Sequence, residues 1–134
     1  MSQDDPPADH TYTPAAQIRY WLEEERRRFL TAVAGLSEAA AQEPLEPGGW
    51  SVHDILAHRL FWEGREVEAL GQYLLGKRVE LLDFPLKRVD GTNARAVATL
   101  QGHTSARLLR ELRQTRAMLM ELLAKVPDAD LNSA

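Results

Sequence analysis

Residues 49–63 have the sequence GWSVHDILAHRLFWE, and this stretch decides the fold because it contains the start of a long helix. Ser51 is a favoured N-cap residue, and Asp54 three positions later completes the pattern of a capping box. Gly49 allows a backbone turn just before the cap that a side chain would hinder. We therefore predict a helix that begins at Val52.

The spacing of the next residues indicates which side of this helix is buried. His58 lies three residues after Ile55 and four before Trp62, so the pattern places its imidazole on the inward face. His53, in the first turn, is expected to face solvent. Gly76 follows as a C-cap, which predicts a helix end near residue 75.

Upstream of this stretch the apolar period predicts another long helix, from Pro14 to about Leu36. Ser37 then opens one or two helical turns. Residues 43–49 form a loop, because two prolines and two glycines do not continue a helix. Residues 1–13 contain Ser, Asp and Pro without an apolar period, so we predict a disordered arm followed by one helical domain over 14–134.

Downstream, residues 77–90 are predicted to be a loop packed over the bundle. A third helical region starts at Asp90 or Thr92 and weakens at residues 102–104. The helix after this break carries the clearest periodic pattern, which steps by four and three residues: Leu108, Leu112, Thr115, Leu119, Leu122 and Val126. Such a heptad-like seam is typical of near-parallel helices in bundles.

Composition excludes several classes of function. The chain has 134 residues, enough for one core, and no Cys, which excludes disulfides, thiolate metal sites and a cysteine nucleophile. Its net charge of −4 gives no general attraction to nucleic acid. No apolar stretch of about 18 residues exists to span a membrane. The acidic start lacks the features of a signal peptide, so the expected location is the cytoplasm.

The stretch 49–58 together with Phe61, Trp62 and Glu63 resembles the second-helix signature of the DinB-like four-helix-bundle superfamily. It is most similar to the branch of the ClbS/DfsB proteins, and similar segments open the mycothiol-dependent maleylpyruvate isomerases. The order of elements is also similar over residues 14–131. The resemblance implies an all-α, up-down helical bundle.

The resemblance also implies a metal site. The His that matches His58 is typically one of three ligands of a divalent metal, here Zn or Ni, which would activate water or polarise a thiol. Trp62, Asn93 and His103 are the candidate residues for the lining of the adjacent pocket. In the family the other two ligands usually come from the last helix of the bundle.

The histidines outside residues 49–63 are His10 and His103, and neither follows the Leu-rich helix. Three long helices are expected, with the fourth helix of the family missing or truncated. Two explanations stay open: the chain is truncated, or it is a short variant that completes its bundle with a partner chain, such as a second copy in a homodimer.

Two functions follow as hypotheses. The first is a metal-dependent hydrolase or thiol transferase that acts on a small molecule, of the stress or detoxification type. The second is a non-catalytic helical module that dimerises or binds a partner through its apolar seam. Glu63 and Glu66 are expected to be solvated, and four arginines form a spiral rather than a stripe on the seam helix: Arg107, Arg110, Arg113 and Arg116.

Overall fold

A computed structural model describes residues 14–131, and this range contains helices and no β-strand. The predicted all-α class is therefore confirmed. The described residues form two compact parts, 14–35 with 123–131 and 36–122. None of the described helices combines the length and the apolar character that crossing a membrane requires. The predicted arm, residues 1–13, lies outside the described residues.

The first part contains α1 (Pro14–Val33) and α6 (Asp128–Leu131), which contact each other. Helix α1 ends before the predicted Leu36. The reason is Gly35, whose φ of 78° is a left-handed conformation that glycine adopts at helix ends.

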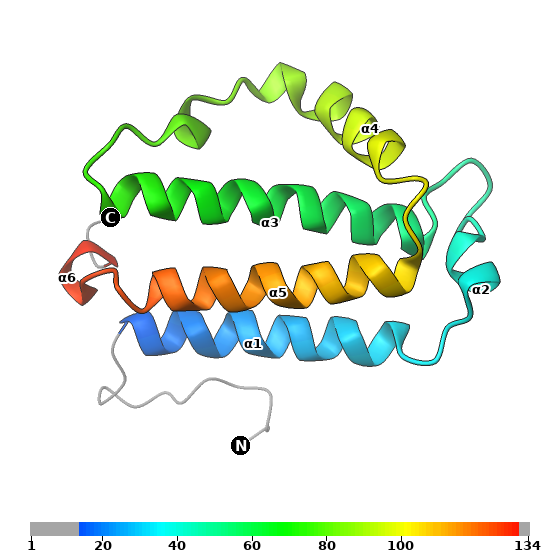
Figure 1. Ribbon diagram of the computed structural model, residues 1–134, viewed down its shortest axis with the longest axis horizontal. Coiled ribbons are helices and arrows are strands. Elements are labelled where there is room, and N and C mark those ends of the chain that lie inside the picture. The colour runs from blue at the N-terminus through cyan, green and yellow to red at the C-terminus, as the bar shows by residue number, and fades with distance from the viewer. Residues whose placement is uncertain (1–13, 132–134) are drawn as a thin grey trace. The chain divides into compact units, whose positions relative to one another are not determined.

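The second part is built around α3. Its elements are α2 (Glu38–Gln42), α3 (Val52–Leu74), the 3₁₀ turns η1 (Glu80–Asp83) and η2 (Leu86–Arg88), α4 (Val89–Thr99) and α5 (Ser105–Leu123). Helix α5 runs along one side of α3, and α4 lies on the opposite side (Figure 1). Helix α3 also contacts α2 and η1. One helix thus has two different neighbours, one on each side.

The start of α3 confirms the predicted capping box. The Ser51 hydroxyl accepts a hydrogen bond from the backbone N–H of Asp54, and the Asp54 carboxylate accepts one from the N–H of Ser51, both at 3.1 Å. The preceding loop approaches itself closely at Gly49. A Cβ atom there would lie 2.6 Å from Cγ of Glu46 and 3.2 Å from its carbonyl oxygen. The loop conformation therefore favours glycine at this position.

The end of α3 is also as predicted, but the segment after it is not. Gly76 has a φ of 70°, and the N–H of Lys77 donates to the carbonyl of Gln72 at 2.9 Å, which together form a Schellman cap. The prediction of a loop over residues 77–90 was wrong, because η1, η2 and the first residues of α4 are helical. Pro85 has no N–H to donate, which separates the two short turns.

The break between α4 and α5 falls where the sequence predicts it. The Thr104 hydroxyl accepts from the N–H of Arg107 at 3.1 Å and so caps α5. Of the predicted seam, Leu108 and Leu112 are fully buried, and two further residues are at most 7% exposed, Leu119 and Val126. The seam is therefore part of the interior, as its spacing indicates.

Candidate functional site

A hydrogen bond between Trp62 and Asn93 joins the middle of α3 to α4. The indole Nε1–H donates to the side-chain oxygen of Asn93 at 2.5 Å. The Trp62 ring also meets the Phe84 ring edge-on, with their centroids 5.4 Å apart. Trp62 thus holds α3, α4 and the segment between η1 and η2 together, which satisfies its polar N–H and buries its apolar ring.

His58 lies one helical turn before Trp62. Its ring centroid is 5.2 Å from that of Trp50. Burial lowers the pKa of His58 below its usual 6.5, against a hydrogen bond with Asn93 that raises it, and the charge of Arg59 lowers it further. The imidazole is therefore mainly neutral at pH 7, which is the form that binds metals. Its Nδ1 atom is buried and makes no hydrogen bond with the described residues.

The described residues do not supply the three-ligand metal site that the resemblance implies. Between residues 14 and 131, no three His, Asp or Glu side chains lie close enough together to hold a metal ion. The side chains placed around the His58 ring are the ring of Trp50 and the carboxamide of Asn93. A single imidazole with such neighbours does not fit a zinc or nickel site of three histidines.

His53 is buried, and the prediction that it faces solvent was wrong. Its Nε2 atom lies 2.6 Å from the carbonyl oxygen of His103, which can only accept, so Nε2–H donates. The turn between α4 and α5 covers the first turn of α3 at this point. Because His53 and His103 are 50 residues apart, the spacing within one helix cannot indicate this contact.

Glu38 binds the same turn from α2. Its carboxylate accepts the N–H of Ser105, the first residue of α5, at 2.9 Å. A hydrogen bond from Gln42 and, to a smaller extent, the contact with Ser105 lower the pKa of Glu38, although partial burial opposes this. His53 and Glu38 therefore fix the turn between α4 and α5 through two of its backbone groups. Neither residue was singled out for this role from the sequence.

A pocket of about 590 Å³ lies between α3 and α4. Its lining contains five apolar side chains, two threonines and three arginines: Leu60, Phe61, Arg65, Phe84, Arg88, Thr92, Arg95, Ala96, Thr99 and Leu100. The predicted lining residues Trp62 and Asn93 are the chain neighbours of Phe61 and Thr92, and they form the adjoining cluster rather than the wall. No pattern in the sequence points to any of the three arginines.

The opposite side of α3 carries a buried ion pair. Glu63 is 6% exposed and contacts the guanidinium of Arg116 on α5. The expectation of a solvated Glu63 was wrong, and Arg116 is also largely buried rather than part of a surface spiral. Charged residues are seldom buried unless they are paired, and pairing across two helices leaves no signature in the sequence of either.

One of three comparisons with known proteins identifies a family. A search of the curated proteins gave no match, and neither did a search of the solved structures. The family model of the DinB superfamily matches residues 21–134, which is more than half of the chain. The all-α fold and the stretch 49–63 are as the resemblance to that superfamily implies. The chain therefore belongs to the DinB superfamily.

Proposed function

We propose that this DinB-superfamily protein binds a small organic molecule in the pocket between α3 and α4. The observation that carries the proposal is the pocket itself. Its volume of about 590 Å³ lies within the range of small-molecule sites, and its wall is mostly apolar with a few polar groups, as such sites are. The Trp62–Asn93 hydrogen bond fixes the two helices that form the walls.

A neutral fluorescent dye, N-phenyl-1-naphthylamine, tests whether this pocket binds small molecules. Its fluorescence should rise on binding to the native protein. Thr99→Phe places a ring in the pocket wall and should weaken binding by about tenfold, since the ring occupies space that the dye would fill. Ala98→Phe is the matched control, because Ala98 is an exposed neighbour outside the lining. Equal binding by both variants would refute the proposal.

The finer version of this function is a metal-dependent hydrolase or thiol transferase, with His58 as a metal ligand. In its favour are the neutral, half-buried imidazole and the membership of the DinB superfamily, which is often associated with metals. Against it is the lack of two further ligands among residues 14–131. We therefore propose binding of the small molecule first and derive no catalytic step through a metal.

A titration of the metal-stripped protein with Ni²⁺ and Zn²⁺ decides between the two versions. Micromolar binding that is lost in His58→Ala would support the metal site and would require ligands from outside the described residues or from a partner chain. His53→Ala is the matched control, because its imidazole already donates to a backbone carbonyl. Absence of binding in the native protein would leave small-molecule binding without a metal.

A second candidate function is a non-catalytic module that forms homodimers. The predicted seam is buried, so the surface that favours this function is another one. Three leucines are exposed near the η1–η2 segment. Leu82 and Leu86 lie within it and are 83% and 88% exposed, and Leu75 precedes it and is 71% exposed. Light scattering of the native protein and of Leu82→Glu tests it: a dimer that the substitution dissociates supports the module, and a concentrated native monomer refutes it.

A further inference from the structure

The charge in the pocket lining is of one sign. Arg65, Arg88 and Arg95 contribute guanidinium groups, while no Asp or Glu belongs to the lining. The remaining wall is apolar or carries a hydroxyl group. Arg88 and Arg95 are exposed and Arg65 is half-buried, so the three cations lie at the open edge of an apolar hollow.

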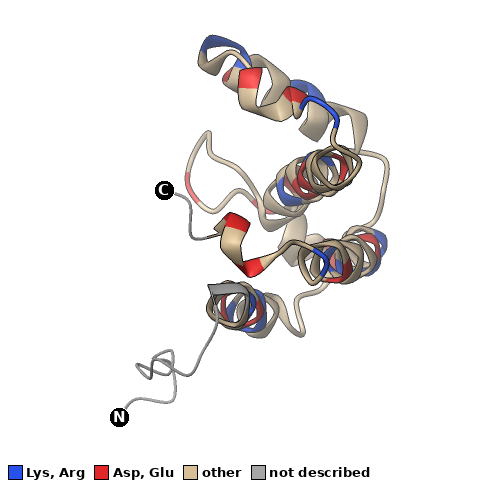
Figure 2. Ribbon diagram, turned by 90° about the vertical axis from the view of Figure 1, so that its left-hand side faces the viewer, with Lys and Arg blue, Asp and Glu red and all other residues tan. Residues whose placement is uncertain are grey.

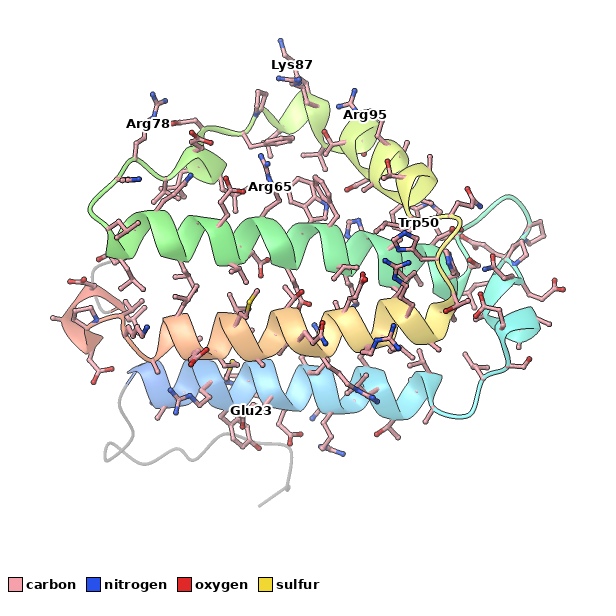
Figure 3. The ribbon with its side chains drawn as sticks, in the orientation of Figure 1. Glu23, Trp50, Arg65, Arg78, Lys87 and Arg95 are labelled. Atoms are coloured by element: carbon pink, nitrogen blue, oxygen red, sulfur yellow. The ribbon has the colours of Figure 1, made fainter. Side chains whose placement is uncertain are left out.

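The three arginines reach the pocket from two sides. Arg65 comes from the middle of α3, and Figure 3 shows it extending toward the η1–η2 segment and α4. Arg88 precedes α4, and Arg95 follows seven residues later on the same helical face. Lys87, next to Arg88, points away from α3 in the same view. Figure 2 shows Lys and Arg residues, in blue, along the η2–α4 segment at the top of the view.

Arg88 and Arg95 lack the internal ion pairs that other arginines in the same part of the chain form. Arg78 binds Asp83 and Arg107 binds Glu111. In the described part of the chain no carboxylate forms an ion pair with Arg88 or Arg95; the Arg95 guanidinium has only a long contact, 3.5 Å, with the Thr92 hydroxyl.

Arg65 is paired only weakly. It lies 4.0 Å from the carboxylate of Glu68, and both side chains are substantially exposed, so solvent screens the attraction. Its guanidinium also stands 6.0 Å above the ring of Phe61, which directs it along the pocket wall. The guanidinium groups of all three arginines therefore keep donors for an external partner.

We propose that the ligand of this pocket is an organic anion, with an oxyanion group bound by Arg65, Arg88 and Arg95 and an apolar body against Phe61 and Phe84. Guanidinium groups bind carboxylate, sulfonate and phosphate oxygens in the same forked geometry, so the shared chemistry is the oxyanion. The two aromatic side chains in the wall favour a flat, unsaturated body. The inference rests on the proposed function, since it requires the pocket to bind a small molecule.

A matched pair of dyes separates the two claims. 8-Anilinonaphthalene-1-sulfonate has the same ring skeleton as N-phenyl-1-naphthylamine and adds one sulfonate group. The native protein should bind the sulfonate dye about tenfold more tightly than the neutral dye, as expected for charge-assisted hydrogen bonds. Arg88→Gln and Arg95→Gln should each weaken the sulfonate dye by about fivefold and leave the neutral dye unchanged.

Lys87→Gln provides the control for charge, because it removes one cation from the same segment outside the lining. It should change the affinity of neither dye. Unchanged binding of the neutral dye also shows that each arginine variant is folded. The inference is overturned if the native protein binds both dyes equally, or if Lys87→Gln acts like Arg95→Gln. In those cases the neutral dye still reports on the proposed function, which fails if Thr99→Phe and Ala98→Phe bind that dye equally.

Discussion

The two sides of α3 handle charge in opposite ways. On the side of α5, the buried Glu63 contacts Arg116, whose side chain is 13% exposed. On the side of α4, Arg65, Arg88 and Arg95 surround a hollow without a carboxylate in its wall. The first arrangement is closed, because each charge finds its partner inside the chain. The second is open, and it leaves cations directed toward a space that a ligand can occupy.

This difference separates structural charge from charge that is available for binding. A buried pair holds two helices in one register, and its loss is costly because one charge then stays buried without its partner. Exposed arginines around a pocket contribute little to stability, so their substitution should change binding instead. Stability and ligand affinity should therefore respond to different sides of the same helix.

The largest effect is expected for Glu63→Gln, which removes the carboxylate that Arg116 contacts. The free energy of unfolding should fall by about 3 kcal/mol, because a buried guanidinium loses its counter-charge. Urea denaturation followed by circular dichroism measures it. Arg65→Gln on the other side of α3 is the control, with an expected change within about 0.5 kcal/mol. Similar losses of stability in both variants would contradict the difference between the two sides of α3.

His53→Leu should have the next largest effect. The substitution places an apolar side chain in a fully buried position but leaves the carbonyl of His103 without its donor. The free energy of unfolding should fall by about 2 kcal/mol. The same urea experiment measures it. His58→Leu is the comparison, and its cost should be smaller because His58 is only half-buried, so that Asn93, its hydrogen-bond partner, keeps the bond from Trp62. A larger cost for His58→Leu would contradict this ranking.

The sequence predicts the parts of this molecule that depend on neighbours along the chain. The capping box of Ser51 and Asp54, the cap at Gly76 and the seam from Leu108 follow from spacing within one element, and the structure confirms them. The stretch 49–63 predicts the DinB superfamily and the family model over residues 21–134 confirms it, whereas the ClbS/DfsB branch stays a prediction.

The site depends on contacts between elements, and there the sequence is less informative. Glu63 and Arg116 are 53 residues apart, and Glu38 and Ser105 are 67 apart. Periodicity assigns each residue to a face of its own helix, but it does not identify the element that covers that face. The resemblance provides Trp62 and Asn93 as candidate lining residues, along with His103, but no pattern in the sequence points to the arginines of the adjoining pocket.

The protonation of His58 gives a further test of the α4 side of α3, because it should make the stability depend on pH. Its pKa in the folded protein is lowered below 6.5, so the unfolded chain takes up the proton first as the pH falls. The free energy of unfolding should therefore decrease as the pH drops through 6.5, and His58→Leu should reduce this slope. Proton NMR of the imidazole should give a pKa below 6.5 in the native protein and a lower value in Asn93→Leu, which removes the group that raises it.

The smallest effect is expected at the turn between α4 and α5, where Glu38 binds Ser105. Glu38→Gln removes the negative charge at the N–H of Ser105, and solvent screens this exposed contact, so the loss should be about 0.5 kcal/mol at neutral pH. The pKa of Glu38 is lowered from 4.5 in the folded protein. Its stabilisation is therefore present above that value and disappears as the pH falls through the folded pKa. The native protein and Glu38→Gln should then converge in acid, whereas Glu43→Gln, on an exposed residue beyond α2, should match the native protein throughout. A difference between the native protein and Glu38→Gln that persists below the folded pKa would mean that this side chain acts through packing rather than through its charge.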